Sequence, residues 1–318
     1  ENKTFIYAFG CSDIGTGTWY FKFNASNTVG NGYSTAATAS NYFSLARDYI
    51  SYANVSGNDS ISNRSGSQTD LFRMKWWDAN GSVATGLNIT FKSTFDSSIW
   101  DSGTINSTGS DGYVYYSFNP SCTPRYYVGP QKWQAIVSGD TCYQDNATPQ
   151  YNFTIKGDIV LTLNKPDGSL NFTQEDIIPF LGYTVDDCGS ALSTNVTFYM
   201  NSTGVGYNCN STAPVLSIGA NAYSCDMVTS QTTTRGYYNA SMNASTNYYY
   251  DNYINNTDSP GLFYLFPLKK LASASVLPSS AGWGYPAWNF SIISSSGDPD
   301  SDYDVKLYIG AGWPPTSE

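Results

Sequence analysis

The chain has 318 residues and a formal net charge of −10, and only 13% of its residues are charged while 16% are aromatic. This length fits about three domains of roughly 100 residues each. The acidic balance offers no basic surface to nucleic-acid phosphates, and no stretch approaches the roughly 18 consecutive apolar residues of a membrane span. The sequence therefore predicts neither a nucleic-acid partner nor a membrane span in this chain.

The composition favours strands over helices. Glu occurs only at positions 1, 175 and 318, and strong helix formers are scarce beside abundant Thr, Tyr and Val. Residues 52–157 contain short alternating apolar segments separated by turn residues, such as 71–77 followed by the turn 78–81. Residues 158–270 repeat this order. We therefore expect an all-β protein with tandem Ig-like β-sandwiches at 52–157 and 158–270.

The two ends each read as part of a sandwich. Residues 271–318 have the pattern of an opening half, and residues 1–51 that of a closing half, with Trp19, Phe21 and Phe23 on one face of a strand. Joined tail to head they make about 99 residues, close to the lengths of about 106 and 113 of the two sandwiches. We expect residues 271–318 to be completed by residues 1–51 of a neighbouring copy or repeat. The alternative is a monomer with two independent hairpins.

Sequons for N-glycosylation are about three times as frequent as chance predicts, since chance placement would give roughly six. There are 18, none with Pro after the Asn: Asn2, Asn24, Asn54, Asn58, Asn63, Asn80, Asn88, Asn106, Asn146, Asn152, Asn171, Asn195, Asn201, Asn210, Asn239, Asn243, Asn255 and Asn289. N-glycans are bulky and hydrated, so they would keep an aromatic, charge-poor surface soluble. The excess predicts a heavily glycosylated protein.

The six cysteines favour disulfides over zinc, because none has a CxxC spacing and the chain contains no His. Disulfides place the protein outside the cell. Cys122 and Cys142 flank one strand and turn, which predicts that they pair. Cys209 with Cys225 would close one excursion of the chain, leaving Cys11 and Cys188 as partners or free thiols.

A family resemblance rests on two motifs. The segment 86–91 (GLNITF), followed by Thr108 and then Asp111-Gly112-Tyr113, resembles invasin-type bacterial Ig-like domains. The sequon density and the two half-domains resemble archaeal S-layer and cell-surface glycoproteins built of Ig-like and PKD-like repeats. The resemblance implies an extracellular structural or adhesive role at the cell surface and carries no catalytic residues.

Three clusters of side chains are candidates for binding or catalysis. Asp298, Asp300, Asp302 and Asp304 alternate in a loop, a spacing that can direct several carboxylates at calcium, although an ordinary solvated acidic turn has the same pattern. The pairs Asp186-Asp187 and Glu175-Asp176 could be the two carboxylates of a glycoside hydrolase, but each sits in a turn or at a strand start, where adjacent residues point apart. A chain without His also has no Ser-His or Cys-His nucleophile. The third cluster is aromatic: Tyr237, Tyr238, Tyr248, Tyr249, Tyr250 and Tyr253. It would stack on sugars if exposed, or form cross-strand pairs with half of the rings in the core.

Together these observations predict a non-enzymatic structural subunit, or repeat unit, of a heavily N-glycosylated extracellular filament or surface layer. Its expected partners are copies of itself, joined head to tail, and covalent N-glycans. The alternative is a cell-surface adhesin or carbohydrate-binding glycoprotein. Calcium is the one cofactor candidate.

Overall fold

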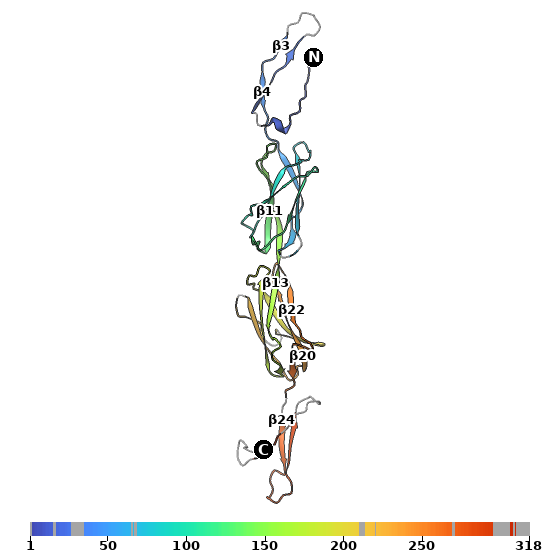
Figure 1. The fold of residues 1–318 in the computed structure, drawn as a ribbon, viewed down its shortest axis with the longest axis vertical. Coiled ribbons are helices and arrows are strands. Elements are labelled where there is room, and N and C mark those ends of the chain that lie inside the picture. The colour runs from blue at the N-terminus through green and yellow to red at the C-terminus, as the bar shows by residue number, and fades with distance from the viewer. Residues whose placement is uncertain are drawn as a thin grey trace. The chain divides into compact units, whose positions relative to one another are not determined.

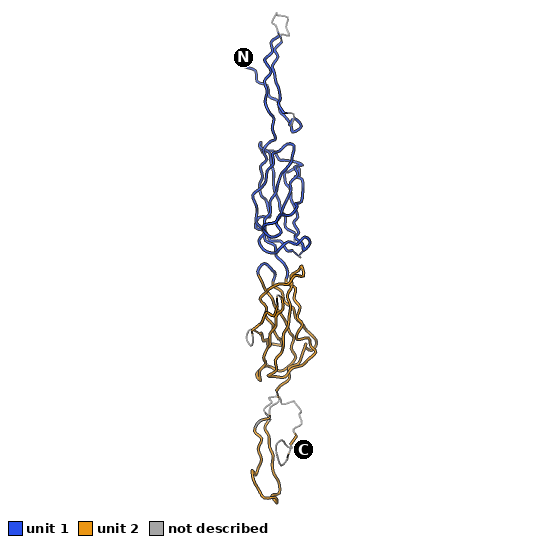
Figure 2. Tube along the Cα trace, turned by 90° about the vertical axis from the view of Figure 1, so that its left-hand side faces the viewer, with its two compact units in different colours: residues 1–158, 247–250 blue, residues 159–246, 251–318 orange. Residues whose placement is uncertain are grey.

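The computed structural model describes residues 2–14, 17–26, 35–64, 66, 69–209, 214–219, 221–268, 271–294, 306, 307 and 309. Contacts divide the chain into two compact units, one of residues 1–158 with 247–250 and one of residues 159–246 with 251–318. Figure 1 shows strands in both units, and Figure 2 colours the units separately. No helix in the described part of the chain is long and apolar enough to cross a membrane.

The first unit contains a two-sheet sandwich. One sheet has the strand order β10 (Tyr113–Phe118), β7 (Asp70–Asp78), β5 (Ile50–Ser56). The other has the order β13, β11, β8, β9, with the short strands β6 and β12 beside β13 and β11. Its strands are β6 (Ser60–Asn63), β8 (Asn88–Ser93), β9 (Thr104–Ser107), β11 (Gly129–Val137), β12 (Asn146–Ala147) and residues 151–158 of β13 (Tyr151–Lys165), which also pairs with β21 (Tyr249–Tyr250).

The core of this sandwich follows from alternation along the strands. On β7, Phe72, Met74 and Trp76 are buried at every second position. Phe72 stacks on Trp133 of β11 with ring centroids 4.5 Å apart, so the two sheets face each other. The indole Nε1 of Trp133 donates to the carbonyl of Gly57 at 2.9 Å, which satisfies the polar atom of this buried side chain.

The second unit contains another two-sheet sandwich. Phe180 of one sheet packs on Phe198 of the other, with ring centroids 5.5 Å apart. The first sheet consists of residues 159–165 of β13, β15 (Ile177–Asp186), β19 (Ala222–Val228) and β18 (Leu216–Ser217). The second consists of β14 (Phe172–Thr173), β23 (Phe263–Phe266), β20 (Gly236–Ser245), β16 (Asn195–Ser202) and β17 (Val205–Asn208), with β22 (Asn252–Asn256) also on β20. The prediction of an all-β protein with tandem β-sandwiches is confirmed.

The remaining strands form two-stranded sheets. In the first unit these are β1 (Thr18–Phe21) with β4 (Asn41–Ser44), and β2 (Asn24–Ala25) with β3 (Ala36–Ala37), after a short 3-10 turn, Cys11–Asp13. In the second unit, β24 (Leu271–Leu277) pairs with β25 (Asn289–Ser294). Isolated two-stranded sheets are marginally stable in water, because they cannot bury an apolar face.

Candidate assembly surfaces and glycosylation sites

Strands β1 to β4 and the segment before them, which we call the N-terminal ribbon, carry an uncovered aromatic face. Trp19 of β1 lies opposite Phe43 of β4, and the Phe9 ring makes edge contacts with both, at centroid distances of 5.4 and 5.1 Å. Despite these contacts, none of the described residues before Ile50 is buried. Residues 4–9, which the sequence predicts to be a strand, belong to no β-ladder here. In the described part of the ribbon, residues 4–9 therefore pair with no strand, and each of its sheets stays two-stranded.

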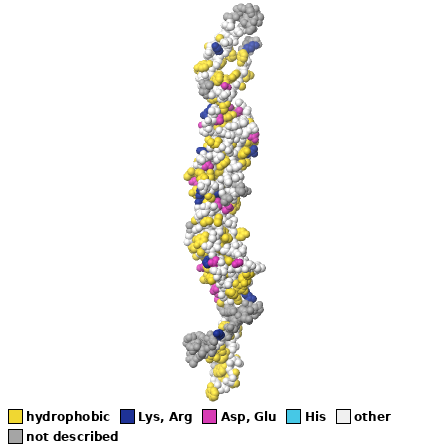
Figure 3. Space-filling view, in the orientation of Figure 1, with side chains coloured by type: hydrophobic (Ala, Val, Ile, Leu, Met, Phe, Trp, Pro, Cys, Tyr) yellow, Lys and Arg dark blue, Asp and Glu magenta, His cyan; other side chains and the backbone are white. Residues whose placement is uncertain are grey.

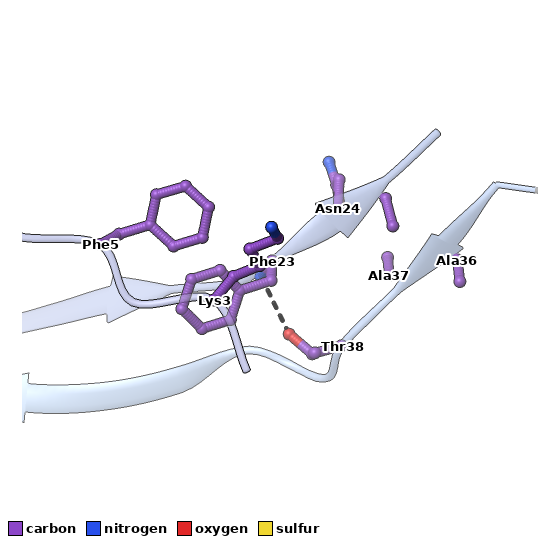
Figure 4. A pocket seen from close by; sticks show the side chains of 8 residues that line it. Lys3, Phe5, Phe23, Asn24, Ala36, Ala37 and Thr38 are labelled. Atoms are coloured by element: carbon purple, nitrogen blue, oxygen red, sulfur yellow. Dashed lines mark hydrogen bonds between the residues drawn. The ribbon is translucent and has the colours of Figure 1, made fainter. Parts of the chain in front are cut away.

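A groove of about 410 Å³ runs along this ribbon (Figure 4). The rings of Phe5 and Phe23, 5.6 Å apart, and the methyl groups of three alanines line it, together with Lys3, Asn24 and Thr38. The Phe23 amide donates to the Thr38 hydroxyl at 3.0 Å, and the Thr38 amide donates to the Phe23 carbonyl at 2.9 Å. These bonds join the two pairs of strands, so the groove has a continuous backbone floor.

The hairpin of β24 and β25, which we call the C-terminal hairpin, likewise leaves apolar side chains uncovered. Val276 of β24 lies opposite Phe290 of β25, and a groove of about 190 Å³ is lined by Phe290, Ile292, Leu307, Lys306 and three small residues. None of the described residues after Leu265 is buried. Figure 3 shows apolar side chains at the surface of both the N-terminal ribbon and this hairpin. Each is an apolar surface larger than scattered single side chains would give.

A disulfide fastens the N-terminal ribbon to the first sandwich, and it corrects one prediction. Cys142 bonds to Cys11, with Cα atoms 5.1 Å apart, so the predicted Cys122–Cys142 pair is wrong. Cys122 is disulfide-bonded, as is Cys188. Spacing favoured the nearest cysteine, whereas the fold brings the turn Cys11–Asp13 beside the loop that holds Cys142.

Polar contacts reinforce this attachment. The Arg47 guanidinium donates to the carbonyls of Asp140 and Tyr143 and forms an ion pair with Asp145 at 2.8 Å. The Asp48 amide donates to the Cys142 carbonyl at 2.8 Å. The hydrogen bond from Arg47 holds the pKa of the Asp145 carboxyl below its usual range, and the Gly139 amide adds to the effect. The residues that lead into β5 are thus fixed to the 140–145 loop.

The Cys209–Cys225 pairing that the sequence allowed is confirmed. Both cysteines are buried, and their Cα atoms are 6.3 Å apart. Cys225 lies on β19, opposite Phe180 of β15. This bond therefore closes an excursion of 16 residues onto the core of the second sandwich.

The sequon asparagines lie where a glycosylating enzyme could reach them. Asn210 is outside the described residues, and none of the others is buried. In Asn106 and Asn146 the side-chain amide, the group to which a glycan attaches, donates to a backbone carbonyl, at 2.7 and 2.9 Å. In Asn58 and Asn201 the amide donates to a neighbouring side chain, at 2.9 and 3.1 Å. Five are half-buried, namely Asn54, Asn63, Asn106, Asn146 and Asn239.

One sheet face of the second sandwich concentrates sequons. Alternate residues of β16, β20 and β22 point away from the core, because their neighbours, such as Phe198 and Met242, are fully buried. The amides of Asn252 and Asn256 donate to carbonyls of β13, which fixes the inward face of β22. The outward positions include Asn195, Asn201, Asn239, Asn243 and Asn255. We call this surface the sequon face.

The tyrosine cluster divides between core and surface. Tyr238 is buried and stacks on Phe263, whereas Tyr237, Tyr248, Tyr250 and Tyr253 are exposed. Tyr253 is the most open, at 74% exposure. Two cross-strand ring pairs form, Tyr238 with Phe263 and Tyr237 with Tyr264, while Tyr249 is half-buried and Lys156 lies over the Tyr250 ring. The expectation of cross-strand pairs therefore holds for part of the cluster, and Tyr253 offers the most open ring face to a ligand.

The acidic clusters serve turns or lie outside the described residues. The carboxylate of Asp186, which is buried, accepts the amides of Cys188 and Ser190 at 3.0 and 2.8 Å, and that of Asp176 accepts the Thr173 amide at 2.6 Å. These bonds are those of turn-forming side chains. The calcium candidates Asp298, Asp300, Asp302 and Asp304 all lie outside the described residues.

Comparisons with known proteins return arrays of β-domains. The chain matches no protein-family model and no curated protein. Similar solved structures include a tetra-tandem repeat in the extending region of a large adhesion protein, with 12% identity, coverage of 89% of this chain and 71% of that chain, and a TM-score of 0.36. Invasin, a bacterial integrin-binding protein, is 13% identical over 78% and 55%, with a TM-score of 0.32. Tandem Ig domains of titin are 7% identical over 70% and 100%, with a TM-score of 0.28.

Proposed function

We propose that this chain is a structural building block of a heavily N-glycosylated extracellular filament or surface layer of the archaeal cell-surface type, assembled head to tail. The C-terminal hairpin of one copy or repeat completes the N-terminal ribbon of the next. The observation that carries the proposal is the contrast in burial. Both sandwiches have complete cores, whereas no described residue before Ile50 or after Leu265 is buried.

The chemistry of the two surfaces fits such a completion. The groove along Phe5 and Phe23 is apolar and open, and the hairpin offers Phe290 and Ile292 as exposed side chains of matching character. Strand addition would give residues 4–9 or the ribbon edge a ladder partner, which none of the residues described in the structure supplies to residues 4–9. It would also cover two edges that otherwise invite aggregation.

Head-to-tail contact explains why the assembly would propagate. Each copy offers one groove and one hairpin, which are different surfaces, so the contact is heterologous and need not close into a ring. Extracellular placement rests on the disulfides, since such bonds persist in oxidising compartments. The glycans would supply the hydration that a surface with few charges lacks.

Two complementary variants test the assembly. Phe23→Ser disables the groove and Phe290→Ser disables the hairpin, so sedimentation and electron microscopy should find each variant monomeric while the unmodified chain forms polymers. A mixture of the two variants should stop at heterodimers, because one intact groove and one intact hairpin remain. Tyr115→Ser, an exposed ring on β10, is the matched control and should polymerise normally. Polymers of either groove or hairpin variant would overturn the proposal.

The second candidate function is that of an adhesin or carbohydrate-binding surface protein. The observation in its favour is the exposure of Tyr237, Tyr248, Tyr250 and Tyr253, because an exposed aromatic ring is a surface on which a sugar can stack. This role predicts saturable binding of free oligosaccharides by the monomeric Phe23→Ser variant, with loss of binding on Tyr253→Ser. A structural subunit predicts no such binding.

A further inference from the structure

Within the sequon face, one sequon differs from the others in its cross-strand partner. Asn243 of β20 lies directly opposite Tyr253 of β22 in the antiparallel register. Opposite residues in such a pair have Cβ atoms about 5 Å apart, so any group attached to the Asn243 amide starts beside the tyrosine ring. Ser245 supplies the hydroxyl of this sequon.

A groove opens between these two residues and the next strand. Its volume is about 310 Å³, and it is lined by Tyr199, Asn201, Ser241, Asn243 and Tyr253. Ser241 points outward but is only 9% exposed, and its hydroxyl accepts the Asn201 amide at 3.1 Å. Ser241 therefore forms a polar floor, with a tyrosine on each of the two flanking strands.

These features suit a sugar. A pyranose ring has an apolar face of C–H groups that packs on an aromatic ring, and hydroxyls at its edge that need polar partners. The groove is about the size of the smallest ligand pockets, ~300 Å³, and combines aromatic walls with a few polar groups. Asp251, which precedes β22, also lines the groove and adds a carboxylate for hydrogen bonding.

We propose that this groove is the docking site of the N-glycan on Asn243, whose first sugars stack on Tyr253 and cover Ser241. The inference rests on the proposed function in one respect only, that the chain is N-glycosylated. Asn243 then carries a glycan that is packed as part of the sheet. Asn255, two residue pairs away on the same strands, lies opposite Ser241 instead of opposite an aromatic residue.

Chemical nitration of tyrosine tests the contact directly. In the glycoprotein isolated from its native source, tetranitromethane should modify Tyr253 several-fold more slowly than in the Asn243→Gln variant. The Asn255→Gln variant removes a sequon from the same strand pair and should leave the slow rate unchanged. Tyr127, exposed on the other unit, reports the general reactivity of surface tyrosines.

A stability measurement supplies the second readout. Asn243→Gln and Tyr253→Ser should each lower the Tm of the second unit by about 2 to 4 °C, and the double variant should lower it no further than either one alone. Additive losses would contradict the docking, as would equal nitration rates with and without the Asn243 sequon. Peptide mapping that shows Asn243 unoccupied would overturn the inference while leaving head-to-tail assembly intact. Slow nitration that persists in Asn243→Gln would assign the groove to a free or neighbouring sugar instead and would also overturn it.

Discussion

Asn201 of β16 and Asn239 of β20 lie directly opposite each other, and each begins a sequon. Asn239 is half-buried, and its side-chain oxygen accepts the Leu262 amide at 3.2 Å, whereas Asn201 is exposed and its amide donates to the Ser241 hydroxyl at 3.1 Å. Two glycans cannot both grow from Cβ atoms about 5 Å apart without crowding. We expect Asn201 to be occupied and Asn239 to be largely empty.

Glycopeptide mass spectrometry of a peptide pair covering both sites checks this expectation. Removing the competitor with Asn201→Gln should raise occupancy at Asn239 only modestly, since the bond to Leu262 remains. Asn255, exposed on the neighbouring strand with no opposing sequon, serves as the reference for full occupancy. Full occupancy of both asparagines in one molecule would contradict the crowding argument.

The Cys11–Cys142 bond should contribute strongly to the first unit. It joins residues 131 apart in sequence, a span that contains most of the sandwich, and restricts the unfolded chain accordingly. The double variant Cys11→Ser/Cys142→Ser should lower the free energy of unfolding of this unit by about 2 to 5 kcal/mol. Calorimetry should show one transition shifted, and limited proteolysis should cut the released ribbon first.

The Cys209–Cys225 bond supplies the matched control for this disulfide. Cys209→Ser/Cys225→Ser breaks a shorter loop in the second unit, so it should shift the second calorimetric transition and leave the ribbon protected. If the first pair of substitutions leaves both the transition and the proteolytic pattern unchanged, the ribbon is held by its polar contacts alone.

Acid should loosen the ribbon through Asp145. The hydrogen bond from Arg47 lowers the pKa of this carboxyl in the folded chain, so the stabilising effect is present above the unfolded pKa, near 3.9, and is lost as pH falls through the folded value. Hydrogen exchange at the Asp48 amide, which donates to Cys142, should therefore accelerate, relative to the intrinsic rate, as the pH falls through the lowered pKa of Asp145.

Asp145→Asn should reproduce the acid effect near neutral pH and remove most of the pH dependence at Asp48. Asp167→Asn is the control, because the pKa of Asp167 is lowered by Lys165 in the second unit. It should leave exchange at Asp48 unchanged. Equal pH profiles for the Asp145→Asn and unmodified chains would show that Arg47 is held by the carbonyls of Asp140 and Tyr143.

The interior strands could be read from the sequence because their alternation is strict. The alternation over residues 113–118 predicts a strand, and it matches β10 at both ends, since a turn with Asp111 and Gly112 precedes it. The same reasoning predicts separate strands at 151–155 and 159–163, yet these are one strand, β13. Gly157 occupies a buried position between Ile155 and Ile159, so the alternation runs through it.

The end segments and the groove could be predicted only in part. The aromatic face of Trp19, Phe21 and Phe23 was evident from spacing, but the contribution of Phe5 to the groove was not, because residues 4–9 form no ladder. Local pattern cannot show which strand lacks a partner, and it cannot show which cysteine lies nearest in space. The Asn243–Tyr253 pair was likewise hidden, since it depends on the register between β20 and β22.

The position of Gly57 requires glycine for two separable reasons. Its φ is +101°, a left-handed conformation, and an added Cβ would lie 2.6 Å from Phe72 and 3.2 Å from Trp133. The backbone conformation alone disfavours alanine by about 1 kcal/mol, and forcing a methyl group into the stacked rings adds about 1 to 3 kcal/mol. Gly57→Ala should therefore destabilise the first unit by about 2 to 4 kcal/mol in denaturant unfolding. Gly81→Ala isolates the backbone contribution, because Gly81 has φ +83° with no atom within 4 Å of the added Cβ, and it should cost only about 1 kcal/mol. Equal losses in the two variants would show that the Phe72–Trp133 stack yields to the methyl group, and that the core around it is looser than its burial indicates.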